Sequence, residues 1–129
     1  VSLVFQDHNL IDYLTPEENL RLVNPKADMK ILEDLGLSRE ESKRNIMHLS
    51  GGQRQRVAVG RALVAPGRAI LADEPTGSLD PEMTDEVIDL LRHAAHQLGK
   101  CVIVVTHSKR VADSADAVYT LRHKKLAKA

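Results

Sequence analysis

The sequence has no tryptophan, a single phenylalanine and a single cysteine. Because aromatic residues make up only 2% of the chain, a hydrophobic core must be built from Leu, Ile, Val and Ala. The lone Cys101 excludes an internal disulfide and fits a reducing cytoplasm. No apolar run approaches the roughly 20 residues of a membrane helix, and no segment reads as a signal peptide. These absences favour an ordinary globular domain.

A net charge is absent as well. Eighteen Lys and Arg residues balance eighteen Asp and Glu residues, so no overall field attracts nucleic acid or an anionic membrane. The 129 residues, 43% of them apolar and 28% charged, suit one soluble domain. The chain opens on Val1 rather than Met, and residues 1–5 already have the pattern of a buried strand. We therefore expect a fold that is truncated at its N-terminus.

Continuous apolar strands alternate with helical patterns along the chain. Strands are predicted at 1–5, 69–72 and 101–106, and this order indicates an α/β fold with a parallel sheet buried on both faces. Helices are predicted at 16–22, 28–35, 52–64, 81–98 and 109–115, with a final strand at 117–121 and a solvated basic tail at 122–129. The helix at 81–98 has an apolar stripe of Met83, Val87, Leu90, Leu91, Ala94 and Leu98.

Capping signals define where several helices start. Thr15 with Glu18, Ser38 with Glu41 and Ser50 with Gln53 have the spacing of a capping box. Asp80 precedes Pro81 as the cap of the helix that begins there. Gly60 lies inside a predicted helix and is expected to cost about 1 kcal/mol relative to Ala.

The helix start at Ser50, Gly51, Gly52 and Gln53 indicates an anion site. Unpaired N–H groups and the helix dipole attract a negative group, and two glycines let it approach the backbone. The alternative is a well-capped helix with a glycine-rich entry and no ligand.

Two carboxylates, Asp73 and Glu74, follow the strand at 69–72. Open α/β sheets bind their ligands at this edge, where one carboxylate can hold Mg²⁺ through water and the other can orient an attacking water. His107 follows the next strand and would lie beside them if the strands are neighbours. Gln6 follows the first strand, where its amide can contact metal or water. The alternatives are a polar turn and a structural histidine.

These motifs, taken in order along the chain, resemble the ATP-binding domain of an ABC transporter. In the family's terms Gln6 resembles the Q-loop glutamine, and residues 49–53 match the signature motif in full. Residues 69–74 resemble the Walker B strand, which implies Asp73 near the metal and Glu74 as general base. Ser78, Leu79 and Asp80 resemble the D-loop, at the dimer interface, and His107 resembles the switch histidine. Residues 72–80 are most similar to the lipoprotein-release, macrolide-export and antimicrobial-peptide-resistance branch.

The chain departs from the family in two ways. The stretch between Gln6 and Ser50 is short for that branch, so we expect a trimmed helical subdomain. No segment reads G-x-x-x-x-G-K-[ST], because the only Gly-Lys pair, Gly99-Lys100, has Ala94 and Cys101 at the other two positions. The resemblance thus implies a partial P-loop NTPase-type fold: a helical subdomain with the signature at 7–66 and a catalytic core at 1–6 and 67–129.

The resemblance also implies a function. We expect an ATP-hydrolysing subunit with ATP and Mg²⁺ as cofactors, peripheral on the cytoplasmic face of the cell membrane. Its implied partners are a second copy or another ABC ATPase domain, and transmembrane permease subunits, with no nucleic acid. In the family two domains pair head to tail, so the residues 50–53 would contact the ATP of the partner. Without a phosphate loop, the 129 residues alone are expected to be inactive.

Two alternatives remain. A non-transport ABC ATPase that acts on ribosomes typically has Asn-His where this chain has Gly77-Ser78, and the DNA-repair branch has a long coiled coil before its signature. The second alternative is a truncated, non-hydrolytic fragment that docks on a partner. His93 and His96 have metal-clip spacing on a helix but no third ligand, which favours a surface role.

Overall fold

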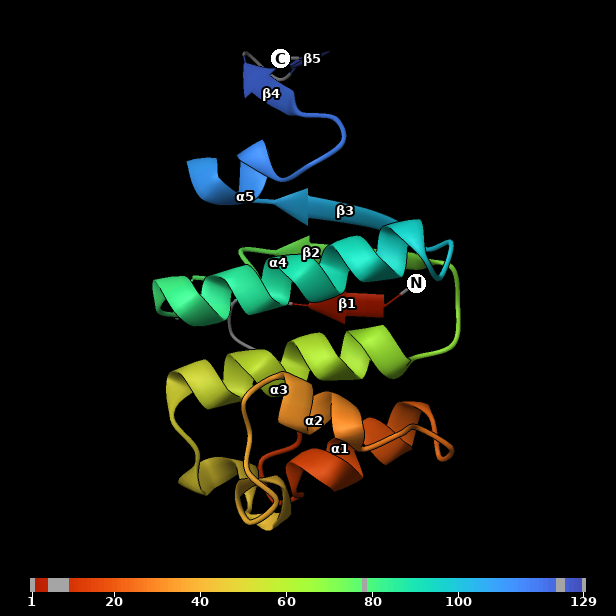
Figure 1. The fold of residues 1–129 in the computed structure, drawn as a ribbon, viewed down its shortest axis with the longest axis vertical. Coiled ribbons are helices and arrows are strands. Elements are labelled where there is room, and N and C mark those ends of the chain that lie inside the picture. Colours follow the sequence, from red (N-terminus) through yellow and green to blue (C-terminus); the bar gives the residue numbers. More distant parts are fainter. Residues whose placement is uncertain (1, 5–9, 78, 123–124, 129) are drawn as a thin grey trace.

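The computed structural model describes residues 2–4, 10–77, 79–122 and 125–128. Strands β1 (Ser2–Val4), β2 (Ala69–Asp73) and β3 (Cys101–Val105) form a parallel sheet in the order β1-β2-β3. Each neighbouring pair is connected through helices, and the sheet lies in the middle of the molecule (Figure 1). The predicted α/β class with a parallel sheet is confirmed.

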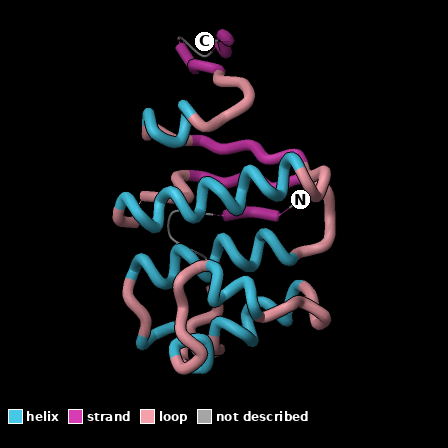
Figure 2. Tube along the Cα trace, in the orientation of Figure 1, coloured by secondary structure: helices cyan, strands magenta, loops and turns pink. Residues whose placement is uncertain are grey.

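The helices occupy the positions that the caps and the periodicity predict, within two or three residues at each end. They are α1 (Pro16–Val23), α2 (Lys30–Asp34), α3 (Gly51–Val64), α4 (Pro81–His96) and α5 (Lys109–Asp113), with single 3₁₀ turns η1 (Glu41–Lys43) and η2 (Ile46–His48). Helical elements fill the part of the chain between β1 and β2, below the sheet in Figure 2.

The predicted capping boxes all form. The Thr15 hydroxyl accepts the Glu18 N–H at 3.1 Å, and the Glu18 carboxylate accepts the Thr15 N–H at 3.0 Å. Ser38 with Glu41 and Ser50 with Gln53 make the same reciprocal pair. Asp80 accepts the N–H of Met83 at 2.8 Å, so α4 begins as predicted.

One aliphatic core joins the helical part, defined as residues 16–64 from α1 to α3, to the sheet and to α4. Its fully buried side chains come from all three: Leu20, Leu32, Leu35, Leu37, Ile46, Val57, Val59, Ile70 and Val87. No aromatic side chain of the described residues belongs to this core, as the composition predicts. The helical part and the sheet therefore form one packed unit.

At β2 and β3 the sheet is covered on one face only, which corrects the prediction of burial on both faces for these two strands. Ile70 and Ala72 of β2 lie buried beneath α3 and α4, whereas Leu71 between them is 39% exposed. On β3 the side chains of Ile103 and Val105 are 54% and 56% exposed. Successive residues of a strand point to opposite faces, so both helices pack on one face and the other is open.

The C-terminal tail contains β5 (Lys125–Lys128), which pairs antiparallel with β4 (Tyr119–Arg122) in a separate two-stranded sheet. The residues of β5 are exposed, as predicted for a solvated tail. One further prediction is wrong in detail. Leu98, placed in the apolar stripe of α4, lies beyond the helix and is 57% exposed.

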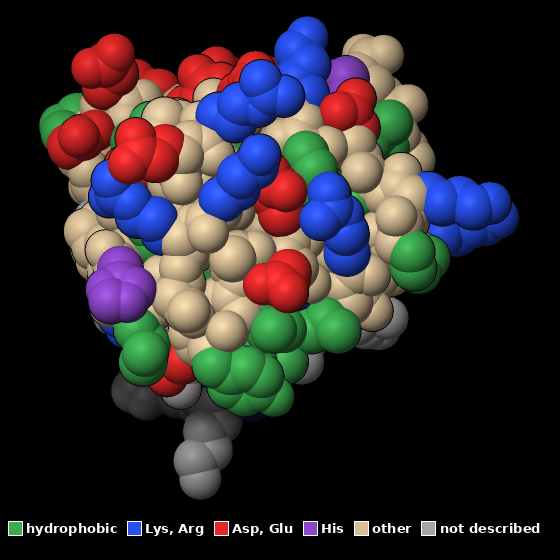
Figure 3. All heavy atoms as spheres, turned by 90° about the horizontal axis from the view of Figure 1, so that it is seen from below, with side chains coloured by type: hydrophobic (Ala, Val, Ile, Leu, Met, Phe, Trp, Pro, Cys, Tyr) green, Lys and Arg blue, Asp and Glu red, His purple; other side chains and the backbone are tan. Residues whose placement is uncertain are grey.

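Charges of both signs are interspersed on the face of the helical part. In Figure 3 Lys and Arg side chains alternate with Asp and Glu side chains, without an extended area of one sign. Across the described residues, no helix has both the length and the apolar character needed to cross a membrane.

Candidate functional site

The start of α3 has the geometry of an anion site. Ser50 is the N-cap in an extended conformation (φ −68°, ψ 165°), and it lies exposed at the surface. Among the described residues the N–H groups of Gly51 and Gly52 have no acceptor, as expected for the first turn of a helix. A Cβ built on Gly51 would meet no atom within 4 Å. A negatively charged group therefore has free access to two backbone donors.

Gln53 makes two side-chain hydrogen bonds within the protein. Its side-chain oxygen accepts the Ser50 N–H at 2.8 Å, and its amide nitrogen donates to the carboxylate of Glu41. The pKa of Glu41 lies below its ordinary value, and the largest cause is the hydrogen bond from the backbone N–H of Ser38. The bond to Glu41 therefore orients the Gln53 side chain beside the anion site.

Glu74 has an unusual backbone at the end of β2. Its φ is 48°, in the left-handed region that costs a non-glycine residue about 1–2 kcal/mol. The conformation is held by its N–H, which donates to the carbonyl of Val105 at 2.8 Å, and by the buried Pro75 that follows. Strained backbone of this kind is frequent at functional sites, where the surrounding contacts maintain it.

The strained turn places the Glu74 carboxylate at the carboxyl edge of β3. Its Oε1 accepts the backbone N–H of His107 at 2.8 Å, and its Oε2 accepts the hydroxyl of Thr106 at 3.2 Å. Each carboxylate oxygen has a second lone-pair direction, so both can still accept a hydrogen bond from water. The predicted proximity of Glu74 to His107 is thus present, but the backbone of His107 makes the contact and its side chain is exposed.

Asp73 is exposed at the end of β2, next to Glu74 in the chain. The described residues contain no group of three His, Cys, Asp or Glu side chains that could hold a metal ion. Mg²⁺ accepts one or two protein carboxylates when waters and phosphate oxygens fill its other positions. An exposed Asp73 fits that ligand set, and the protein alone does not provide a closed metal cage.

Four predicted site residues remain. Two of them, Gln6 and Ser78, lie outside the described residues. Leu79 is half-buried, and the carboxylate of Asp80 caps α4.

Sequence reasoning missed Gln55 and Thr106. Gln55 is fully buried, and its amide nitrogen donates to the carbonyl of Pro75 at 2.7 Å. A signal for it existed, because Gln55 shares one helical face with Val59 and Ala62 at i+4 and i+7, where a buried residue is expected. No local signal marks Thr106, whose hydroxyl reaches Glu74 only through the pairing of the strands.

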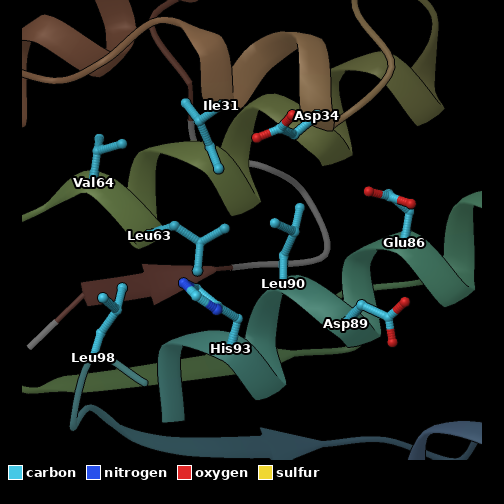
Figure 4. A pocket seen from close by; sticks show the side chains of 9 residues that line it. All are labelled: Ile31, Asp34, Leu63, Val64, Glu86, Asp89, Leu90, His93 and Leu98. Atoms are coloured by element: carbon cyan, nitrogen blue, oxygen red, sulfur yellow. The ribbon is translucent and has the colours of Figure 1, made fainter. Parts of the chain in front are cut away.

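The two helix histidines take no part in this site. His96 Nε2 lies 2.8 Å from the carboxylate of Asp116, and this hydrogen bond holds the pKa of Asp116 below its ordinary value. His93 lines a hollow of about 480 Å³ between α2, α3 and α4, together with the aliphatic and acidic side chains of Ile31, Asp34, Leu63, Val64, Glu86, Asp89, Leu90 and Leu98 (Figure 4). None of the predicted site residues lines this hollow.

The chain is similar in sequence to known proteins. Residues 1–77 match the family model described as "ABC transporter". The chain is 41% identical to the lipoprotein-releasing system ATP-binding protein LolD of Rickettsia prowazekii, over 95% of this chain and 60% of LolD. It is 43% identical to the macrolide export ATP-binding/permease protein MacB of Brucella melitensis, over 94% of this chain and 20% of MacB.

The fold agrees with solved structures. The dimeric structure of the ABC transporter cassette MJ0796 superposes with a TM-score of 0.83 at 35% identity, over 92% of this chain and 57% of that cassette. A post-hydrolysis state of MJ0796 bound to ADP and Pi superposes equally well, at 32% identity over 98% of this chain and 62% of that chain. The chain therefore spans less than two thirds of the length of these relatives. The family match, the identities and the shared fold together assign this chain to the ABC transporter family.

Proposed function

We propose that these residues belong to the ATP-binding and ATP-hydrolysing subunit of an ABC transporter, in which ATP hydrolysis drives transport across a membrane. The observation that carries the proposal is the Glu74 carboxylate, held at the carboxyl edge of the sheet by Thr106 and His107. The open helix start at Ser50 supports a second, separate contact with a phosphate group.

The residues would divide the chemistry between them. Glu74 would orient an attacking water and accept its proton, because its carboxylate is fixed and keeps free lone pairs. Asp73 would hold Mg²⁺ through water, with Gln6 at the same ion, and the metal would neutralise phosphate charge. His107 would donate a hydrogen bond to the terminal phosphate. Residues 50–53 would bind the ATP held by a partner domain, with Leu79 and Asp80 at the dimer interface.

The proposal extends to partners and location. The subunit would pair with a second copy or another ABC ATPase domain, as the dimeric MJ0796 cassette does. Permease subunits would receive the motion, because LolD and MacB carry ATP-binding functions of a release and an export system by name. In this proposal the subunit lies peripherally on the cytoplasmic face of the cell membrane.

The test uses an extended chain, defined as residues 1–129 preceded by a segment of a family relative that carries G-x-x-x-x-G-K-[ST]. Glu74→Gln in the extended chain should still bind Mg-ATP, but its hydrolysis rate should fall by about 100-fold or by a larger factor. The amide keeps the shape of the side chain and loses the basic oxygen. Dimers formed with ATP should persist longer in this variant.

Glu86→Gln is the matched control, because Glu86 lies exposed in α4 and lines the hollow that contains none of the predicted site residues. It should leave the hydrolysis rate unchanged. Hydrolysis by Glu74→Gln near the parent rate would remove Glu74 from the role of general base. An extended chain that binds no ATP would favour the alternative of a docking fragment.

A further inference from the structure

Gln55 is a buried amide that connects α3 to the turn after β2. Its side chain is fully buried, and Nε2 donates to the carbonyl of Pro75 at 2.7 Å while lying 3.5 Å from the carbonyl of Glu74. The two elements are separated by about 20 residues in the chain, so this contact exists only in the folded protein. Through it, the helix that begins at Ser50 holds the backbone on both sides of the Glu74–Pro75 peptide.

The cost of burying this amide indicates a specific role. Gln55 Oε1 is buried and has no hydrogen-bond partner among the described residues. An unpaired buried acceptor destabilises a protein, and an apolar side chain of equal size would avoid it. Packing alone therefore does not account for a glutamine at this position, whereas the bonds of its Nε2 do.

The turn that Gln55 holds needs external support. Glu74 has the left-handed φ of 48°, and its carbonyl also accepts the N–H of Gly77 at 3.2 Å. In this conformation of the turn its carboxylate accepts hydrogen bonds from Thr106 and from the His107 N–H. Support from the helix side by Gln55 complements support from the strand side by Val105.

We propose that Gln55 is a positioning residue that fixes the Glu74 carboxylate and links its position to the signature helix. Gln55 lies five residues from Ser50 in the same helix, a rise of about 7.5 Å along a rigid element. A shift of the helix start on contact with the ATP of a partner would therefore reach Glu74 directly. This inference rests on the proposed function. The signature of one chain would contact the partner's nucleotide, and that contact would change the position of Glu74, which acts on the nucleotide bound by its own chain.

The first test measures hydrolysis by the extended chain. Gln55→Met keeps the length of the side chain and removes the donor, so kcat should fall by about 10- to 100-fold. The KM for Mg-ATP should stay within about twofold, because the nucleotide contacts are elsewhere. In a Glu74→Gln background, Gln55→Met should slow the residual single-turnover rate no further, since it acts through Glu74.

Val59→Ala is the control for general destabilisation, because Val59 is fully buried in the same helix and contacts the core. It should lower the melting temperature without lowering kcat at a temperature where the protein is folded. A kcat within twofold of the parent for Gln55→Met overturns the proposal. An additional loss in the Glu74→Gln background, equal to that in the parent, overturns it as well.

A second measurement on residues 1–129 themselves does not depend on ATPase activity. The His107 N–H that donates to Glu74 should exchange with solvent about tenfold faster in Gln55→Met, beyond the change seen in Val59→Ala. Unchanged exchange would show that Gln55 does not position the carboxylate, even if the extended chain proves inactive. If Gln55→Met does not fold, the side-chain NH₂ protons of Gln55 in the unaltered chain decide: slow exchange supports the proposal, and solvent-like exchange overturns it.

Discussion

Ser50 has two roles that a single substitution can separate. Its hydroxyl accepts the Gln53 N–H and so caps α3, while its exposed position borders the two free amides of Gly51 and Gly52. Removal of the cap costs about 1 kcal/mol of stability. A large side chain that fills the anion site affects only the binding of a ligand from outside the chain.

Ser50→Arg in the extended chain is expected to block ATP-driven dimerisation, because the large side chain fills the anion site. ATP binding by a single domain should change little, since the signature would serve the nucleotide of the partner. Light scattering with Mg-ATP measures the first effect and equilibrium dialysis the second. Thr15→Arg is the matched control: it removes the same kind of capping box from the start of α1, and the side-chain bonds of that cap do not involve residues 49–53. A large loss of monomer affinity in Ser50→Arg would mean that the signature contacts ATP in the same chain.

Glu41 gives a prediction for acid pH. Its pKa is lowered in the folded protein, first by the hydrogen bond from the Ser38 N–H. The carboxylate therefore contributes stability that is fully present above its ordinary pKa of 4.5 and is lost as the pH falls through the lower, folded value. Glu41→Gln should destabilise the protein at pH 7 by less than about 1 kcal/mol. Urea titrations of both proteins should converge as the pH falls through the lowered, folded pKa of Glu41, and a difference that grows on acidification contradicts this account.

At the scale of elements, two of the three glycines of α3, Gly51 and Gly60, lie in opposite environments. A Cβ on Gly60 would lie 2.9 Å from the Cδ1 of Leu35, a fully buried side chain. At Gly51, in the first turn, a Cβ would meet nothing within 4 Å. Helix propensity alone predicts that alanine stabilises the helix at an interior position by about 1 kcal/mol.

We expect the same substitution to have opposite effects at these positions. Gly60→Ala should destabilise residues 1–129 by about 1–3 kcal/mol, because overpacking of Leu35 outweighs the gain in propensity. Gly51→Ala should be neutral or stabilise by up to about 1 kcal/mol. Urea denaturation with a constant slope measures both. A stabilised Gly60→Ala would show that Leu35 can move aside without cost.

At the scale of the whole molecule, two features set what residues 1–129 can do alone. No segment carries the lysine and the ring of backbone donors of a phosphate loop, which provide most of the affinity for a triphosphate. One face of the sheet exposes Leu71, Ile103 and Val105, an apolar surface that favours association between copies.

Residues 1–129 are therefore expected to show no significant ATPase activity and weak or no affinity for Mg-ATP. Asp73 and Glu74 would present two negative charges to an anionic ligand, with only Mg²⁺ to offset them. Calorimetric titration of material with a confirmed intact mass of 14.3 kDa measures this affinity. The extended chain is the control and should bind Mg-ATP. Micromolar binding by residues 1–129 would require a phosphate site that these residues do not reveal.

Local sequence determined the class, the helix starts and the identity of the motifs. A capping box such as Ser50 with Gln53 spans three residues, so the same pattern forms wherever a helix begins, and it could be predicted without the fold. The strands at 69–73 and 101–105 were predictable because continuous aliphatic runs between helices favour parallel strands.

Only the tertiary structure decided how the site is held. Glu74 lies in a left-handed turn, and its carboxylate bonds to Thr106 and His107. Gln55 donates a hydrogen bond to Pro75. These bonds join residues that are 20–33 positions apart in the chain. Such contacts depend on which strands are neighbours and on which face of the sheet the helices cover. The hydrophobic periodicity of a single segment predicts neither. The open face of the sheet and the cost of a side chain at Gly60 have the same origin, because both depend on what other segments place there.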